Sequence, residues 1–272
     1  MIIKIRDFDC SEVWDGVFYK KLSNYPSVTP FEIRNIIEFI EYEKLHGRGC
    51  TIECEDRRLL DEINEKLGER EKYINSPPPK LLTECTACLD RGCRTDLVCH
   101  ATSLENAIKI FRCGSLLSAT KARGIPADEL MKESRNAAND PVDYFDYIMF
   151  AWGNCQGGDR LVTERNLGRF PNEDDLGVNF KPGIRFYFEY ERLASHPNRV
   201  FDGVLPMKVK DEVRLCDWVY KIVIPEEVKE KLADFIPENL QSKIVYIKND
   251  CKDIWEWSRK VYKTVKERKN DI

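Results

Sequence analysis

The chain has 272 residues, of which 42% are hydrophobic and 33% are charged, and its formal net charge is −4. This length and composition predict a folded protein with a substantial core in one large domain or two smaller ones. The slightly acidic balance excludes an overall electrostatic attraction to nucleic acid, so any contact with nucleic acid needs a local basic patch.

No run of 18 apolar residues occurs, so the sequence predicts no membrane-spanning helix and no membrane partner. The opening residues MIIKIRDFDCSE lack the basic start, apolar core and small-residue cleavage site of a signal peptide. We therefore expect a cytoplasmic protein whose eleven cysteines are thiols or metal ligands rather than disulfides.

The N-terminal part of the chain predicts a small unit of alternating strands and helices. The run MIIKI is a short strand. A helix then begins where Thr29 is a suitable N-cap, Pro30 fits the first helical position and Glu32 completes a capping box. The run CTIEC forms the next strand, and Asp56 begins a second helix, so we expect a β-α-β-α unit.

The segment NSPPPK, residues 75–80, is the clearest linker in the sequence, because three prolines favour an extended and semi-rigid chain. This linker predicts two domains: a small α/β N-terminal unit over residues 1–80, which includes the linker, and a second domain over residues 81–272.

Strand-like runs recur in the second half of the chain, and helical segments lie between some of them. The runs are LVCH, YIMFAW, GIRFYFEY, DWVYKIVIP and KIVYIK. The last helical segment is CKDIWEWSRKVYKTVKER, and the glycine-rich GNCQGGDR predicts a flexible loop. These patterns predict an α+β fold with a mostly antiparallel β core and helices at its edges.

The run CTACLDRGC brings Cys85, Cys88 and Cys93 close to Cys99 and His100. A Cys-x-x-Cys pair is typical of a structural zinc knuckle, and four thiols could close a tetrahedral site. No second such pair follows, so we favour unliganded thiols in a turn-rich connector and expect no zinc. A zinc site would compete for the side chain of His100.

The run LVCHATSLENAIKIFRCGSLLSA places His100 and Thr102 on one face of a strand end, because side chains alternate along a strand. Ser103 is a suitable cap for a helix with Asn106 in its first turn, and Gly114 ends that helix. Two interpretations remain open: a histidine satisfied by hydrogen bonds in a core, or polar groups presented to a ligand.

A strand that ends in His-x-Thr, a helix with Asn in its first turn and a following Gly-x-Leu resemble the start of the NAD-binding site in the ADP-ribosyltransferase superfamily. The later segments are similar in order to those of the DarT-like DNA ADP-ribosyltransferases. KESRNAANDPV carries Arg135, DYIMFAW matches an aromatic strand, and KVKDEVRL carries Glu212 ahead of an apolar segment and a closing strand. The resemblance covers about residues 97–250.

The resemblance implies an α+β fold with an ADP-ribosyltransferase-like split β core and flanking helices. It implies a toxin-like activity that uses NAD as a substrate and modifies a nucleobase in single-stranded DNA or RNA, with a neutralising antitoxin-like partner. The residues that it assigns to NAD binding are His100, Thr102, Asn106, Tyr147 and Phe150, and those that it assigns to catalysis are Arg135 and Glu212.

These residue types suit the chemistry. Cleavage of the nicotinamide–ribose bond develops positive charge on the ribose, which a carboxylate such as that of Glu212 stabilises. The guanidinium of Arg135 can pair with phosphate or polarise the acceptor, and the ring of Tyr147, Phe150 or Tyr187 can lie against the nicotinamide. Taken alone, KVKDEVRL is equally an exposed edge strand with Asp211 and Glu212 on opposite faces, and Arg135 is equally a surface residue.

Other functions remain open at this stage. The same residues would suit an RNA 2′-phosphotransferase that uses NAD or an NAD glycohydrolase, and the cysteine cluster would suit a non-enzymatic zinc-bearing binding module. Basic and aromatic residues alternate between residues 120 and 170, where they form either a nucleic-acid groove or an ordinary charged surface.

Overall fold

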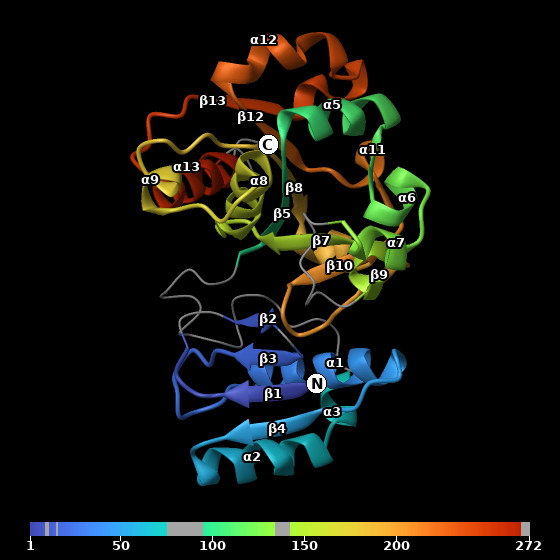
Figure 1. Cartoon of the computed structure of the whole chain (residues 1–272), viewed down its shortest axis with the longest axis vertical. Coiled ribbons are helices and arrows are strands. Elements are labelled where there is room, and N and C mark those ends of the chain that lie inside the picture. Colours follow the sequence, from blue (N-terminus) through green and yellow to red (C-terminus); the bar gives the residue numbers. More distant parts are fainter. Residues whose placement is uncertain (9–10, 15, 75–94, 134–141, 268–272) are drawn as a thin grey trace.

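In the computed structural model, the described residues are 1–8, 11–14, 16–74, 95–133 and 142–267. They form a mixed α+β structure with a four-stranded sheet, a seven-stranded sheet and a two-stranded sheet. Figure 1 shows the four-stranded sheet and its helices at one end of the long axis and the seven-stranded sheet at the other.

The four-stranded sheet and three helices form the N-terminal unit, the name used below for residues 1–74. Its elements are β1 (Ile2–Ile5), β2 (Glu12–Trp14), β3 (Val17–Lys20), α1 (Pro30–Leu45), β4 (Thr51–Cys54), α2 (Arg57–Gly68) and α3 (Glu71–Ile74). The strand order is β2-β3-β1-β4, and β1 is parallel to both of its neighbours. The sequence predicts β1, α1, β4 and α2 but not β2 and β3, whose three- and four-residue lengths give almost no periodicity.

The start of α1 shows why this helix is predictable. The Thr29 hydroxyl accepts a hydrogen bond from the Glu32 amide at 3.3 Å, and the Glu32 carboxylate accepts one from the Thr29 amide at 2.8 Å. This reciprocal pair is the predicted capping box. The buried face of α1 packs Ile33, Ile36 and Phe39 into a core of the N-terminal unit.

The second half of the chain contains nine strands and the helices that cover them, in the described residues. The strands are β5 (Leu97–Thr102), β6 (Ser115–Leu117), β7 (Tyr147–Trp152), β8 (Ile184–Glu189), β9 (Arg199–Val200), β10 (Met207–Lys210), β11 (Glu212–Arg214), β12 (Lys221–Pro225) and β13 (Ile244–Ile247). The α-helices are α5 (Leu104–Cys113), α6 (Ala119–Arg123), α7 (Ala127–Met131), α8 (Gly157–Leu167), α9 (Glu173–Leu176), α10 (Tyr190–Leu193), α11 (Leu215–Trp218), α12 (Lys229–Leu232) and α13 (Ile254–Glu267). Short 3₁₀ helices are η1 (Val142–Asp146), η2 (Glu226–Val228), η3 (Ala233–Phe235) and η4 (Glu238–Lys243).

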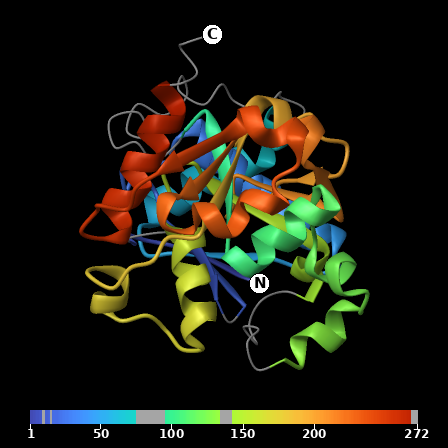
Figure 2. The ribbon, with the colours of Figure 1, turned by 90° about the horizontal axis from the view of Figure 1, so that it is seen from above.

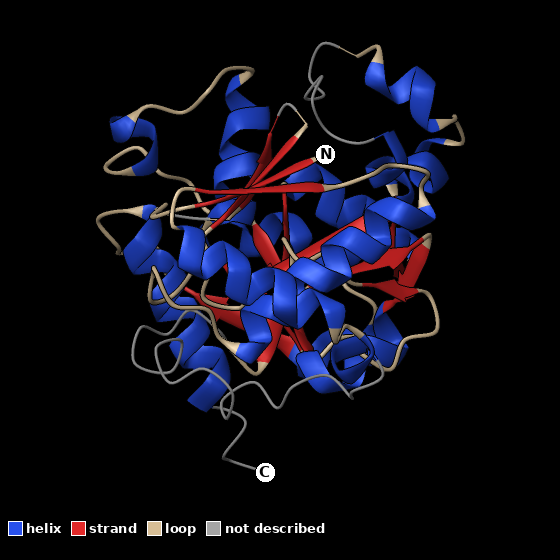
Figure 3. Cartoon of the chain, turned by 90° about the horizontal axis from the view of Figure 1, so that it is seen from below, coloured by secondary structure: helices blue, strands red, loops and turns tan. Residues whose placement is uncertain are grey.

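The large sheet has the strand order β13-β12-β8-β5-β7-β10-β9, and only its β12–β13 pair is parallel. Each of the five predicted strand runs contains a strand, namely β5, β7, β8, β12 and β13, although the run DWVYKIVIP begins inside α11 and is a strand only from Lys221. Figure 2 shows α8, α9 and α13 on one side of this sheet and α5, α6 and α7 on the other, and Figure 3 shows helices surrounding the strands. Each face therefore has its own apolar core.

The segment KVKDEVRL differs from its predicted form as one continuous strand. Asp211 has a φ of 66°, in the left-handed region, and it separates β10 from β11. Strand β10 pairs with β7 in the large sheet, whereas β11 pairs with β6 in the two-stranded sheet. The prediction that Asp211 and Glu212 lie on opposite faces of one strand is therefore wrong, because the chain changes sheets between them.

The segment GNCQGGDR also differs from the predicted flexible loop, because α8 begins inside it at Gly157. A Cβ atom on Gly158 would lie 2.9 Å from the Cβ atom of Ala101. The glycine thus lets α8 approach β5 closely, which explains a glycine in the first turn of a helix.

The N-terminal unit packs closely against the loop that precedes β10. A Cβ atom on Gly203 would lie 1.9 Å from the carbonyl oxygen of Asn35 on α1, and Gly203 has a φ of 76°. The next residue, Val204, packs against the apolar core of the N-terminal unit. None of the helices in the part of the chain that the structure describes is long and apolar enough to cross a membrane.

Candidate functional site

One edge of the seven-stranded sheet collects several residues that the sequence singles out. Thr102 at the end of β5 pairs with Ile184 at the start of β8, and β7 also runs antiparallel to β5. Lys210 at the end of β10 pairs with Tyr147 at the start of β7. The end of β5, the start of β7 and the end of β10 therefore share one edge, which we call the β5 edge, and Glu212 follows two residues after β10.

His100 lies on β5 two residues before Thr102 and is largely buried, and its Nδ1 lies 3.0 Å from the carbonyl oxygen of Met149. A carbonyl oxygen only accepts hydrogen bonds, so Nδ1 carries the proton and Nε2 of the neutral ring is an acceptor. Burial lowers the pKa of His100, and the hydrogen bond to Met149 only partly opposes this effect. His100 therefore offers a hydrogen-bond acceptor near the β5 edge.

A pH dependence of stability follows from the lowered pKa of His100. The unfolded chain, with an imidazole pKa of about 6.5, binds a proton more readily than the folded chain. The stability that neutral His100 contributes to the folded state is thus fully present above about pH 6.5, and it is lost as the pH falls towards the lowered pKa of the folded protein. We expect the free energy of unfolding of wild type to decline relative to that of His100→Gln in denaturant titrations between about pH 7 and pH 5. Parallel pH profiles of the two proteins would contradict this assignment.

Thr102 and Asn106 lie on either side of the start of α5. Thr102 is buried at the end of β5. Its carbonyl oxygen is so close to Gly183 that a Cβ atom on Gly183 would lie 2.4 Å from that oxygen. The Ser103 hydroxyl accepts a hydrogen bond from the Asn106 amide at 3.3 Å, as predicted for an N-cap, and the side chain of Asn106 is exposed. The predicted order of strand, cap and helix is confirmed, and Gly114 ends the helix with a φ of 72°.

Glu212 lies at the start of β11, and both of its carboxylate oxygens accept hydrogen bonds. The Ser115 hydroxyl on β6 donates to Oε1 at 2.8 Å, and the Lys121 ammonium on α6 donates to Oε2 at 2.7 Å. The hydrogen bond from Lys121, followed by that from Ser115, lowers the pKa of Glu212. Glu212 is thus a half-exposed, ionised carboxylate with a defined orientation; its two partners are not recognisable in the sequence, since neither is close to it along the chain.

The backbone around Glu212 is also held in place. The Asp211 amide donates to the Asp146 carbonyl at 3.0 Å, and the Asp211 carbonyl accepts from the Ser118 amide at 2.8 Å. The Asp146 carboxylate in turn accepts a hydrogen bond from the Thr120 hydroxyl at 2.8 Å. These bonds connect the Asp211 turn to both η1 and α6.

The aromatic candidates differ in how they are placed. Phe150 is fully buried with its ring edge-on to that of Phe188, and Tyr187 is fully buried with its hydroxyl donating to the Gly153 carbonyl. Neither ring has a face open to a ligand. Tyr147 is half-buried at the β5 edge, so it is the best placed of the three. Arg135 lies outside the described residues.

The proposed zinc ligands can be assessed only in part, since Cys85, Cys88 and Cys93 lie outside the described residues. Cys99 is buried in the core beneath β5, and burial raises the pKa of its thiol to about 12. Its neighbour His100 points to the opposite face of the strand. Within the ranges that the structure describes, no group of three His, Cys, Asp or Glu side chains could hold a metal ion.

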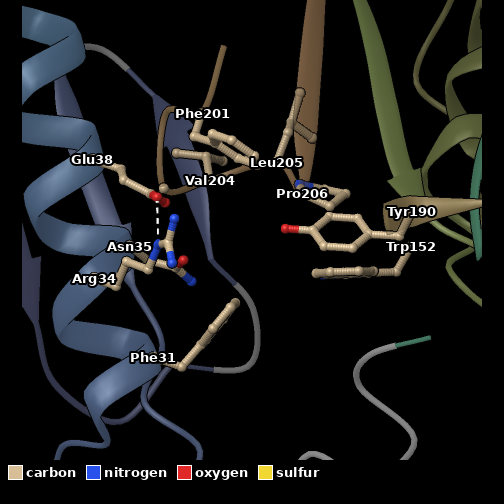
Figure 4. A pocket seen from close by; sticks show the side chains of 11 residues that line it. Phe31, Arg34, Asn35, Glu38, Trp152, Tyr190, Phe201, Val204, Leu205 and Pro206 are labelled. Atoms are coloured by element: carbon tan, nitrogen blue, oxygen red, sulfur yellow. Dashed lines mark hydrogen bonds and ion pairs between the residues drawn. The ribbon is translucent and has the colours of Figure 1, made fainter. Parts of the chain in front are cut away.

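A separate pocket lies between α1 and the seven-stranded sheet, as Figure 4 shows. Its walls include Arg34 and Glu38 of α1, which form an ion pair at 2.6 Å, and the rings of Trp152 and Tyr190. The cavity volume of about 30 Å³ has room for one or two water molecules and not for a dinucleotide. Trp152 ends β7, so this pocket lies at the sheet edge opposite to Tyr147.

No family model, no curated protein and no solved structure matches this chain. The geometry of the β5 edge and the order of the motifs along the chain are the features that bear on its function.

Proposed function

We propose that the chain is an NAD-dependent ADP-ribosyltransferase and that its reaction takes place at the β5 edge. The observation that carries the proposal is the placement of His100, Thr102 and Tyr147 at one edge of the large sheet, with Glu212 on β11 two residues after β10 ends at that edge; these segments are far apart in the sequence. These four residues follow the order along the chain that the resemblance implies; of the other residues that it assigns, Phe150 is buried in the core and Arg135 lies outside the described residues.

The residues at the β5 edge have complementary roles in this reaction. Nε2 of neutral His100 accepts a hydrogen bond from a ribose hydroxyl, and the half-exposed ring of Tyr147 lies against the nicotinamide. The bond between the ribose C1′ and the nicotinamide nitrogen breaks, and its electron pair stays on the leaving nicotinamide. The Glu212 carboxylate stabilises the positive charge that develops on the ribose while a nucleobase nitrogen or oxygen attacks C1′. The proton of the nucleobase then passes to Glu212 or to water.

Binding of NAD is the first test. NAD in excess should raise the melting temperature of wild type by mass action, and His100→Ala should abolish most of that rise, because the ribose loses its acceptor. Glu41→Gln is the control, since Glu41 forms an exposed ion pair with Arg70 within the N-terminal unit and its loss should leave the NAD effect unchanged. Equal protection of His100→Ala and wild type would show that NAD binds elsewhere.

The acceptor requires a second measurement. Labelled NAD incubated with wild type and single-stranded oligonucleotides should leave the label covalently attached to the nucleic acid. Release of free ADP-ribose with no attachment to any oligonucleotide would replace the transferase with an NAD glycohydrolase that uses the same residues.

A further inference from the structure

We propose that the N-terminal unit positions Glu212, and that Asp143 and Lys208 are the positioning residues that connect the two. The catalytic part of this inference rests on the proposed function, whereas its structural part can be measured without any activity. Two sets of contacts, described in turn below, lead from α1 to the Asp211 turn.

The first set of contacts centres on the carboxylate of Asp143 in η1. Three side chains of the N-terminal unit converge on it: the Tyr42 hydroxyl donates a hydrogen bond, His46 Nε2 lies 3.0 Å away and Arg48 Nη1 lies 3.3 Å away. Arg48 also pairs with the fully buried Glu43 of α1, which fixes its position. Hydrogen bonds and ion pairs to Asp143 thereby connect the C-terminal end of α1 and the residues after it to η1.

The same 3₁₀ helix reaches the Asp211 turn. Asp143 and Asp146 belong to the single five-residue helix η1, and the Asp146 carbonyl accepts the Asp211 amide. A shift of η1 at Asp143 therefore changes the anchor of the residue directly before Glu212. Each step of this path is a direct contact or a covalent connection. Side chains of the N-terminal unit contact Asp143, η1 connects Asp143 to Asp146, and Asp146 bonds the residue before Glu212.

The second set of contacts surrounds Lys208 on β10, three residues before Asp211. Its ammonium is fully buried and forms an ion pair with the buried Asp202. It lies 3.3 Å from the ring centroid of Tyr144 in η1 and 4.2 Å from that of Tyr42 on α1, both within cation–π range. The aromatic rings around the Lys208 ammonium thus come from both the N-terminal unit, through Tyr42, and η1, through Tyr144.

Charged groups are an unusual choice for a junction that only has to hold two units together. Burying a cation and carboxylates costs desolvation, and apolar side chains of similar size often stabilise a protein as well or better. Each side of the junction already has its own apolar core. What directional hydrogen bonds add is a fixed orientation of η1 and β10, which is the property that Glu212 needs for catalysis.

The test uses Asp143→Asn, which keeps the shape of the side chain and removes its charge, and Tyr42→Phe, which keeps the ring over Lys208 and removes the donated hydroxyl. Both should reduce kcat for NAD turnover about tenfold and change KM for NAD by no more than about threefold, because only Tyr147 of the proposed NAD-binding residues directly follows η1, whereas His100 and Thr102 lie on β5. Both should also speed hydrogen exchange of the Asp211 amide. The double variant should cost less than the two single effects added, since Tyr42→Phe removes the Tyr42–Asp143 hydrogen bond and Asp143→Asn weakens the same bond by removing its charge. Glu41→Gln, which breaks the exposed ion pair with Arg70, is the control and should change neither quantity.

The outcomes separate the two proposals. A lower melting temperature with unchanged kcat and unchanged exchange of Asp211 would reduce the junction to a structural contact and overturn the inference. If wild type itself turns over no NAD, the proposed function fails, and hydrogen exchange alone decides the inference: faster exchange at Asp211 supports the positioning, and unchanged exchange rejects it.

Discussion

Glu212→Gln is expected to lower NAD turnover by about two or more orders of magnitude, the effect of losing one electrostatic stabiliser of a transition state. The glutamine amide oxygen can still accept from Lys121, and the Ser115 hydroxyl can turn to accept from the amide nitrogen, so the local geometry should survive. A carboxylate that acts only as charge develops contributes little to ground-state binding. NAD should therefore protect this variant against heat almost as well as it protects wild type.

Asp211→Asn is the matched control for this substitution, for a reason that the structure supplies. Asp211 occupies the left-handed region, which asparagine tolerates as well as aspartate does, and its hydrogen bonds to Asp146 and Ser118 are made by the backbone. Turnover by Asp211→Asn should stay close to that of wild type. Equal losses in both variants, or unchanged turnover in Glu212→Gln, would place the reaction away from Glu212.

Asp159→Asn should destabilise the fold by about 3–5 kcal/mol, because it leaves a buried guanidinium without its counter-charge. Arg185 is fully buried on β8; its Nε donates to Asp159 at 2.6 Å, and its other nitrogens bond Tyr187 and Ser258. The network joins β8 to α8 and α13, so its loss should act on the whole second half of the chain. Urea denaturation followed by circular dichroism measures the change.

Two comparisons sharpen this stability prediction. Glu105→Gln breaks an exposed i,i+4 ion pair with Lys109 and should leave the free energy of unfolding nearly unchanged. The double variant Asp159→Leu with Arg185→Met removes both buried charges and should recover much of the stability lost in Asp159→Asn. A similar small loss in Asp159→Asn and Glu105→Gln would mean that water reaches the buried pair.

The sequence predicts the elements whose signals are local. The capping box at Thr29 and the α5 segment from Ser103 to Gly114 depend on neighbours within a few residues, and both are confirmed. Alternation along β5 also places His100 and Thr102 on one face without knowledge of the rest of the chain. The left-handed turn at Asp211 escapes prediction, because it arises from pairing with two different sheets.

The sequence does not predict which side chains of a strand are accessible, because this depends on the segments that pack over the strand. In MKVK, alternation predicts that Lys208 and Lys210 share a solvent-exposed face, yet Lys208 is fully buried because Tyr42 of α1 lies over it. The sequence predicts that the aromatic ring of Phe150 can lie against the nicotinamide, but Phe188 of the large sheet packs against that ring. Which aromatic and charged side chains stay accessible is decided by segments that lie far away in the sequence.

The close approach at Gly203 has a practical consequence for dividing the chain into shorter fragments. A fragment that begins after the proline-rich segment would leave Val204 and the Lys208–Asp202 pair facing water, since α1 would no longer cover them. Such a fragment is expected to be poorly soluble when produced alone and to be rescued by co-expression of residues 1–74. Any side chain larger than hydrogen at position 203 would separate the same two surfaces, so a single methyl group there should mimic the cut.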